Sequence, residues 1–276
     1  MKSIAIITNI NKDKNLEYTN KIKSLLPDNI NVAVATSTDG ICDAIKGADV
    51  AVVLGGDGTI LACANCAAEY NIPMMGIHLG TLGFLAEVEK TEIENAIARL
   101  LSGDYRIEER LMLDATVIRG EKEICTYSAL NDFVISCSSV RRIISTDIYI
   151  GNSFAGRYNG DGVIFATPTG STGYNLSAGG PILDTELRTG VITPICPHSS
   201  FSTSIVIPSE KTVRVLLNDT FSKESILTTD GQQGFELDSN DIVEIKASNK
   251  KTRLIKIYDR SLYEVLSIKK ITAERN

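Results

Sequence analysis

The first hundred residues alternate short apolar runs with longer segments of mixed polarity. The apolar runs predict four strands, at residues 3–8, 31–36, 50–55 and 73–78. Helical spacing of apolar residues predicts helices at residues 40–48, 59–70 and 92–103. Regular alternation of strand and helix is typical of a parallel sheet with helices on its faces. We therefore predict an α/β domain with a parallel sheet over residues 1–108.

After about Leu111 the pattern changes to apolar and polar residues that alternate, with turn signals between the runs. This alternation predicts antiparallel strands with one buried face. We therefore expect an all-β, sandwich-like domain over residues 109–257. Residues 261–270 return to helical spacing, so a C-terminal helix over about 258–276 is expected to pack back on the first domain.

Composition and charge exclude several classes of function. Of the 276 residues, 43% are hydrophobic and 22% charged, and the formal net charge is −6. The acidic balance argues against nucleic-acid binding, which needs clustered Lys and Arg. No apolar run approaches the roughly 20 residues that span a bilayer, and the N-terminus lacks the pattern of a signal peptide. We therefore predict a cytoplasmic protein that binds neither nucleic acid nor membrane.

The six cysteines do not form a pattern typical of a zinc site. Cys63 and Cys66 are close together, but no second pair follows to complete a tetrahedral site. We interpret both as small apolar residues that face the core. Two histidines are too few for a three-histidine metal site.

A glycine-rich turn with one carboxylate, "GGDGT" at residues 55–59, follows the third predicted strand. Glycines let the backbone come close to a ligand, and amides at a helix start can face an anion. The spacing of a P-loop and that of a dinucleotide fingerprint are both absent. Two interpretations remain at this point. The turn binds phosphate through Gly55, Gly56, Gly58 and Thr59, or it is a tight connection in which Asp57 caps the helix.

A second candidate segment, residues 159–182, combines hydroxyl side chains, glycines and one aromatic residue, Tyr174. Hydroxyls and free backbone amides at this density suit the phosphates and sugar hydroxyls of a nucleotide. The alternative is a surface loop rich in Ser and Gly. A loop of that length is uncommon in a compact domain unless it has a function.

Six motifs occur in the order in which the NAD kinase family has them, and the chain resembles that family from about Val50 to Gln232. The motifs are "GGDGT" at 55–59, "LGTLGFLAE" at 79–87, "ALNDFVI" at 129–135, "DGVIFATPTGSTGYNLSAGGPI" at 161–182, "TPICPHS" at 193–199 and "DGQ" at 230–232. The first is shared with diacylglycerol-kinase-like proteins and phosphofructokinases. The long fourth motif together with the fifth is specific.

The resemblance implies an enzyme that moves the γ-phosphoryl group of ATP, or of polyphosphate, to the 2′-hydroxyl of the adenosine ribose of NAD. It implies an α/β domain, a β-sandwich-like domain and an active site between them. Asp57 would take the proton of the attacking hydroxyl, since a sugar hydroxyl is a weak nucleophile. A divalent cation, Mg²⁺, would accompany ATP. Relatives form homodimers and homotetramers, so we expect one of these states.

The same resemblance implies the residues that bind NAD. These are Gly58, Phe84, Asn131, Asp132, Arg142, Asp161, Thr172, Gly173, Tyr174, Ser177 and Gln232. No metal ligand from the protein is implied. Relatives commonly have Glu at position 132 and Ala at position 173, so this chain has a shorter acid and a smaller residue there.

Two alternative functions remain open. A lipid kinase of the diacylglycerol-kinase-like group shares the glycine turn, but the acidic composition and residues 161–182 count against it. A non-catalytic dinucleotide sensor would have the same pocket, but the presence of Asp57 counts against it.

Overall fold

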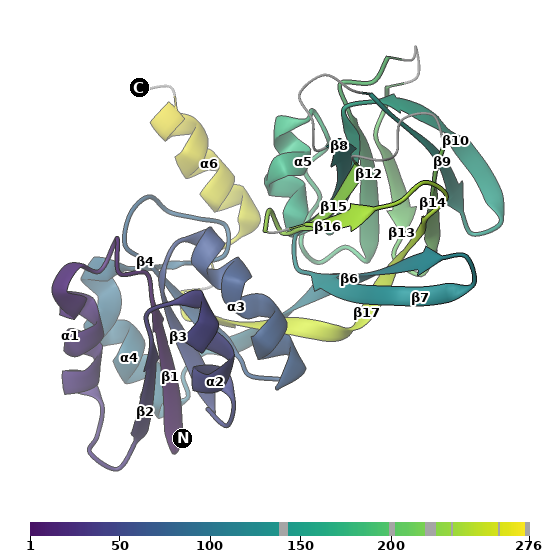
Figure 1. Ribbon diagram of the computed structural model, residues 1–276. Coiled ribbons are helices and arrows are strands. Elements are labelled where there is room, and N and C mark those ends of the chain that lie inside the picture. The colour runs from purple at the N-terminus through teal and green to yellow at the C-terminus, as the bar shows by residue number, and fades with distance from the viewer. Residues whose placement is uncertain (138–142, 199–201, 219–224, 233, 259, 274–276) are drawn as a thin grey trace. The chain divides into compact units, whose positions relative to one another are not determined.

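The chain forms two compact units (Figure 1). A computed structural model describes residues 1–276 except 138–142, 199–201, 219–224, 233, 259 and 274–276. Unit one contains Met1–Arg110 and Lys251–Asn276, and unit two contains Leu111–Lys250. Two long strands, β6 (Arg106–Arg119) and β17 (Ile242–Lys256), carry the chain from one unit to the other.

Unit one contains the predicted parallel sheet, in the order β4-β3-β1-β2. Its strands are β1 (Ser3–Thr8), β2 (Asn31–Ala35), β3 (Val50–Gly55) and β4 (Met74–His78), with the short β5 (Val88–Glu89) parallel to β4. Every residue of β3 and β4 is buried. This explains the continuous apolar runs, because helices cover both faces of such a sheet.

The helices of unit one follow the predicted alternation, with one addition. They are α1 (Glu17–Leu25), α2 (Ile41–Ile45), α3 (Asp57–Glu69) and α4 (Ile93–Ser102), with single turns η1 (Lys14–Leu16), η2 (Thr38–Gly40) and η3 (Lys90–Glu92). The segment that became α1 is rich in polar residues, and only Thr19 and Ile22 of its described residues are buried. Its apolar signal was therefore too weak for a sequence prediction.

The two neighbouring cysteines of α3 have different environments. Cys63 is buried, and burial raises the pKa of its thiol to about 12. The core-facing prediction is therefore confirmed for Cys63. It is wrong for Cys66, which is half-buried and forms a disulfide with Cys42. The two Cα atoms lie 5.4 Å apart, because α2 packs against α3.

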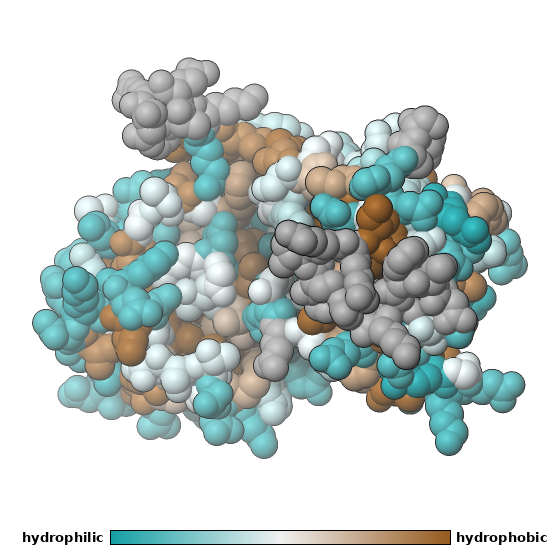
Figure 2. Space-filling view, turned by 45° about the horizontal axis from the view of Figure 1, so that its top comes forward, coloured by the Kyte–Doolittle hydropathy of each residue, from teal (hydrophilic) through white to brown (hydrophobic). Residues whose placement is uncertain are grey.

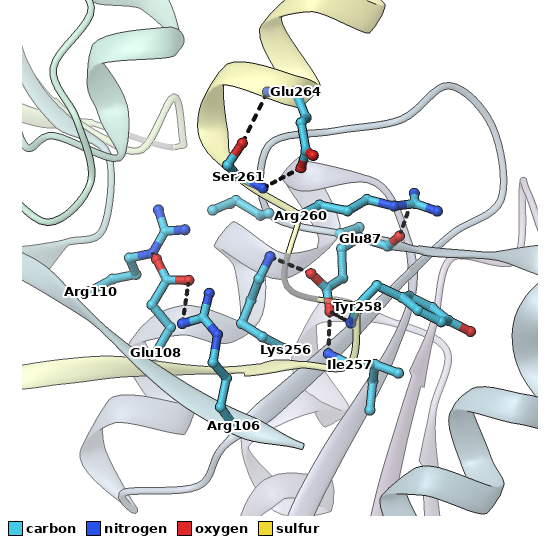
Figure 3. Close-up of polar contacts among 12 residues, drawn as sticks. Glu87, Arg106, Glu108, Arg110, Lys256, Ile257, Tyr258, Arg260, Ser261 and Glu264 are labelled. Atoms are coloured by element: carbon cyan, nitrogen blue, oxygen red, sulfur yellow. Dashed lines mark hydrogen bonds and ion pairs between the residues drawn. The ribbon is translucent and has the colours of Figure 1, made fainter. Parts of the chain in front are cut away.

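A buried ion pair fastens the C-terminal segment within unit one (Figure 3). The ammonium of Lys256 lies 2.5 Å from the carboxylate of Glu87. The same carboxylate accepts hydrogen bonds from the backbone N–H groups of Ile257 and Tyr258. The chain then continues into α6 (Leu262–Ala273). Glu87 thus holds the end of β17 in place through one charge and two amides.

Unit two contains two antiparallel sheets with one core between them, as predicted for a sandwich-like domain. One sheet has the order β13-β12-β11-β8-β15-β16, and the other strands pair as β10-β9-β14-β17 and β6-β7. Phe133, Phe165 and Val215 are among the buried residues of the core. The strands not yet named are β7 (Lys122–Ala129), β8 (Asp132–Cys137), β9 (Ile144–Ile150), β10 (Ser153–Gly160), β11 (Gly162–Ala166), β12 (Thr189–Ile195), β13 (Ile205–Pro208), β14 (Val213–Leu217), β15 (Ser225–Thr229) and β16 (Phe235–Leu237).

Residues 159–182 are not one loop, so the alternative interpretation of the whole segment as a surface loop is wrong. Their first part ends β10 and forms β11, a central strand that pairs with β8 and β12. A single turn, η4 (Gly170–Thr172), and the short helix α5 (Tyr174–Ser177) follow. The apolar run from Gly162 to Ala166 is buried at every residue, which stabilises it as a strand.

Large exposed hydrophobic side chains are scattered over the surface. Among the described residues, Phe154 and Tyr263 are the most exposed of these, at 56% and 63%. On the face drawn in Figure 2, hydrophilic residues are interspersed with hydrophobic ones. None of the helices in the described residues is both long and apolar enough to cross a membrane.

Candidate functional site

In the parallel sheet of unit one, the direction in which the chain adds strands reverses between β1 and β3. The chain passes from β1 to β2 on one side and from β3 to β4 on the other (Figure 1). In open α/β sheets, ligands bind at the carboxyl ends of the strands where the order reverses in this way. The glycine turn after β3 lies at this point, next to the loop that follows β1.

A cavity of 530 Å³ lies at the switch point. It is formed by the end of β1 with the following loop, by the segment after β2, and by the glycine turn. The residues that line this switch-point cavity are Ile7, Thr8, Asn9, Ile10, Asn11, Lys12, Thr36, Ser37, Thr38, Ile41, Gly56, Asp57, Gly58, Thr59 and Ala62. Its volume is in the range that holds small-molecule ligands.

The glycines of the turn have separate structural reasons. Gly56 and Gly58 line the cavity together with Thr59, but Gly55 is buried and does not. A Cβ on Gly55 would lie 2.1 Å from the hydroxyl oxygen of Thr59. Gly55 is therefore needed to make room for Thr59, whose hydroxyl in turn accepts the N–H of Gly56 at 3.4 Å.

Asp57 is the first residue of α3 and does not cap the helix. The cap position is occupied by Gly56, so the alternative interpretation of Asp57 as the cap is wrong. The carboxylate of Asp57 instead accepts backbone N–H groups from another loop, those of Phe84 at 2.8 Å and Leu85 at 3.0 Å. A third N–H, that of Ala86, lies 3.4 Å away.

This amide clamp, the three N–H groups of residues 84–86 on Asp57, fixes the carboxylate at the edge of the switch-point cavity. Gly83 allows the loop to come close, because a Cβ there would lie 2.0 Å from Asp57 Oδ1. A carboxylate oxygen has two lone pairs, so an oxygen that accepts one amide can still accept a proton or a hydroxyl. Asp57 is half-buried, and it is one of the residues that line the cavity.

Phe84 contributes its backbone N–H to this clamp, whereas its ring contacts Lys269. The ring is half-buried, and the ammonium of Lys269 on α6 lies 4.8 Å from its centroid. This is the geometry of a cation–π contact within unit one.

In unit two, Asp230 organises the start of β8. Its carboxylate accepts the backbone N–H groups of Leu130, Asn131 and Asp132 at 2.7 to 3.0 Å. The carboxyl of Asp132 is buried, and burial together with the nearby charge of Asp230 raises its pKa to about 7. Burial also raises the pKa of Asp230, although the three amides oppose this shift. Asp132 is therefore a carboxyl group that titrates near neutral pH.

Three of the predicted NAD-binding residues meet at this place. A Cβ on Gly173 would lie 3.4 Å from the side-chain nitrogen of Asn131 and 4.0 Å from a carboxylate oxygen of Asp132. The side-chain oxygen of Asn131 is buried and has no hydrogen-bond partner among the described residues. An unsatisfied buried acceptor is costly, and a donor from a ligand would satisfy it.

Close packing and hydrogen bonds from hydroxyl groups to the backbone hold this cluster together. Gly170 packs directly on the Asn131 backbone, where a Cβ would lie 2.1 Å from the carbonyl oxygen. The Thr167 hydroxyl donates to the Leu130 carbonyl at 2.6 Å and accepts the N–H of Gly170 at 3.0 Å. The Thr172 hydroxyl donates to the Thr169 carbonyl at 3.1 Å.

Four more of the predicted residues of unit two are exposed. Tyr174 and Ser177 are exposed on α5, Asp161 is exposed between β10 and β11, and Gln232 is exposed after β15. Arg142 lies outside the described residues. The structure thus brings Asn131, Asp132 and Gly173 together in unit two, and Gly56–Thr59 with the backbone of Phe84 in unit one.

Sequence reasoning missed the groups that hold the predicted ones. Asp230 lies in the "DGQ" motif, but the resemblance to the family implied a role only for Gln232 of this motif. The amides of residues 84–86 leave no side-chain signal, although "LGFLAE" contains them. Lys12, which lines the switch-point cavity, lies in a polar stretch with other lysines and had no distinguishing signal.

Two family models match the chain, and their order follows the two units. Residues 29–105 match the ATP-NAD kinase N-terminal domain, and residues 130–257 match the ATP-NAD kinase C-terminal domain. The NAD kinase of Natranaerobius thermophilus is 43% identical over 98% of both chains. The NAD kinase of Thermoanaerobacter sp. X514 is 39% identical, over 96% of this chain and 98% of the relative.

Two solved structures have the same fold. A yeast NADH kinase complexed with NADH superposes with a TM-score of 0.81 at 22% identity, over 97% of this chain and 86% of the yeast chain. An NAD kinase from Archaeoglobus fulgidus in complex with ATP gives a TM-score of 0.77 at 22% identity, over 96% of this chain and 99% of the other.

Proposed function

Because the chain belongs to the NAD kinase family, we propose that it transfers the γ-phosphoryl group of ATP to the 2′-hydroxyl of the adenosine ribose of NAD, with Asp57 as the base. The observation that carries this proposal is the amide clamp. It fixes one carboxylate at the edge of a cavity at the sheet switch point. ADP and NADP are the products.

The reaction needs positioning and one proton acceptor. The 2′-oxygen forms a bond to the γ-phosphorus of ATP while the bond from that phosphorus to the β,γ-bridging oxygen breaks. The electron pair of the broken bond leaves with ADP. The proton of the hydroxyl passes to the carboxylate of Asp57, whose oxygens have more lone pairs than the three amides occupy. The clamp keeps the carboxylate in one orientation, so that little reorganisation is needed during transfer.

We assign NAD binding to the cluster of unit two. Asn131 and Asp132 offer acceptors for ribose hydroxyls and for the amino group of adenine, and the unpartnered oxygen of Asn131 supports this. Gly173, Thr172, Tyr174, Ser177, Asp161 and Gln232 belong to the same proposal, as does Gly58 in unit one. Asp132 has one methylene less than glutamate, so either the backbone comes closer to the ribose or a water molecule bridges the carboxylate and the ribose.

A divalent cation would enter this site bound to the phosphates of ATP. The described residues include no group of three or more His, Cys, Asp or Glu side chains that could hold a metal ion. Mg²⁺ is commonly held by one or two carboxylates, water and the phosphates of the substrate. Asp57 is the carboxylate at the cavity, so the donor phosphates would supply most ligands, and Mg²⁺ would neutralise their charge.

The assembly and the location of the protein belong to the proposal as well. We propose a homodimer or homotetramer in the cytoplasm. Light scattering coupled to size-exclusion chromatography would measure the mass of the assembly, and a monomeric mass at micromolar concentration would contradict it.

The test is direct. The purified chain is incubated with NAD, ATP and Mg²⁺, and NADP is measured by an NADP-specific dehydrogenase. Parallel reactions replace ATP by polyphosphate, or NAD by a diglyceride. NADP formation supports the proposal. Phosphorylation of the diglyceride without NADP would favour the lipid kinase, and NAD binding without turnover on either donor would favour the sensor.

A further inference from the structure

The loop after β1 is held in one conformation by a buried carboxylate. Asp13 is 1% exposed. It accepts the hydroxyl protons of Thr8 at 3.1 Å and of Thr19 at 2.6 Å. It also accepts the backbone N–H groups of Tyr18 and Thr19 at 2.9 and 3.0 Å. The residue before it, Lys12, donates its own N–H to the carbonyl of Asn9 at 2.9 Å. The backbone that carries Lys12 is therefore fixed at both sides.

The side chain of Lys12 extends over the glycine turn. A Cβ built on Gly56 would lie 3.1 Å from Lys12 Nζ, so the ammonium lies directly above the backbone at the start of α3. Lys12 also lines the switch-point cavity, and it is the one cationic residue among the described residues that do so. Asp57 is the one anionic residue of the same lining.

A phosphate donor at this cavity meets a specific electrostatic difficulty. The carboxylate of Asp57 repels the phosphates that must come close to it, and this repulsion is stronger at a partly desolvated site than in water. The N–H groups at the start of α3 attract anions, but they carry only partial charge. A full positive charge at the same place offsets the repulsion, and lysine supplies three donors for phosphate oxygens.

We propose that Lys12 binds the phosphates of the donor above the turn formed by residues 55–59. In this arrangement the lysine of the phosphate site comes from the loop after the first strand, so it is absent from the glycine turn itself. Its ammonium holds the donor beside Asp57 and stabilises charge on the leaving phosphate during transfer. This inference rests on the proposed function, because it assumes that the cavity binds the phosphate donor.

The test compares Lys12→Gln with Lys14→Gln. Lys14 is an exposed lysine two residues away that does not line the cavity, so its substitution is the matched control. For Lys12→Gln we expect kcat/KM for ATP to fall about 10- to 100-fold, the range for a lost hydrogen bond to a charged group. KM for NAD and the midpoint of urea unfolding stay close to those of Lys14→Gln. Lys12→Arg retains more activity than Lys12→Gln, because it keeps the charge.

The possible outcomes separate this inference from the proposed function. If the unaltered protein makes no NADP from any donor, the proposed function fails. If it makes NADP and Lys12→Gln has the kinetic constants of Lys14→Gln, only the role of Lys12 is overturned. Equal loss with ATP and with polyphosphate supports a phosphate contact. If KM for NAD rises as much as KM for ATP, the contact of Lys12 with the donor phosphates is contradicted. The same holds if the midpoint of urea unfolding falls in Lys12→Gln but not in Lys14→Gln.

Discussion

At the residue scale, the carboxylate of Asp57 is fixed by backbone amides and still has lone pairs that can accept a proton. The amides of residues 84–86 come to it from a separate loop, and Gly83 makes their approach possible. The glycine-rich sequence predicted a close approach of backbone to ligand. Part of that freedom serves the protein itself, since Gly55 makes room for Thr59 and Gly83 for Asp57.

We expect Gly83→Ala to disturb the amide clamp. Its Cβ would lie 2.0 Å from Asp57 Oδ1, so either the carboxylate or the loop must move. Overpacking of this kind typically costs about 1–3 kcal/mol in the free energy of unfolding. Urea unfolding measures the loss, and kcat for NADP formation falls with it. Gly80→Ala is the control, since a Cβ there meets no atom within 4 Å. Equal stability of the two variants would contradict the clamp.

The buried carboxyl of Asp132 predicts a pH dependence of stability. Its pKa in the folded chain is about 7, against 3.8 for the ordinary value, so folding favours the neutral acid. Its stabilising contribution is complete below about pH 4 and is lost as pH rises to about 7, by about 1.4 kcal/mol per pH unit.

The variant Asp132→Asn lacks the titrating carboxyl, so comparing it with the unaltered protein isolates the contribution of Asp132 to the pH dependence of stability. We expect the free energy of unfolding of the variant, minus that of the unaltered protein, to increase from pH 5 to pH 7 and to stay constant above pH 7. Urea unfolding at pH 5, 6, 7 and 8 gives the four differences. A constant difference over the whole range would show that Asp132 is ionised throughout.

At the scale of elements, strands with a strong apolar signal agree with the prediction most closely. β1 and β3 have the predicted bounds, because a strand buried on both faces must be apolar throughout. Helix α1 was not predicted, because few of its residues are buried. Residues 162–166 lie in the region predicted to form antiparallel strands, although the hydroxyls and glycines that follow them favour a long turn over residues 159–182.

The segment that returns to unit one depends on Glu87. We expect Glu87→Gln to destabilise the protein by about 3–5 kcal/mol, because it leaves the buried ammonium of Lys256 without its ion pair. Glu89→Gln is the control: its pair with Arg260 is partly exposed, at 3.7 Å, and is worth about 1 kcal/mol or less. Urea unfolding compares the two. Losses of similar size would contradict the role assigned to Glu87.

At the scale of the whole molecule, the sequence predicted the class of each unit and the family. Periodicity distinguishes a parallel sheet from an antiparallel one, and short motifs with fixed chemistry identify the family. Contacts between segments far apart in the chain could not be predicted in this way. Asp230 with residues 130–132, Glu87 with Lys256, and Lys12 over Gly56 each join groups whose proximity is determined by tertiary packing.

The central claim is that Asp57 accepts the proton of the NAD 2′-hydroxyl at this site. The most direct measurement is steady-state NADP formation by Asp57→Asn, together with the Kd for NAD from calorimetry. Asparagine has the same shape but cannot accept the proton, so we predict that kcat falls about 10²- to 10⁴-fold while the Kd for NAD changes little. A kcat within a few-fold of that of the unaltered protein would contradict the claim.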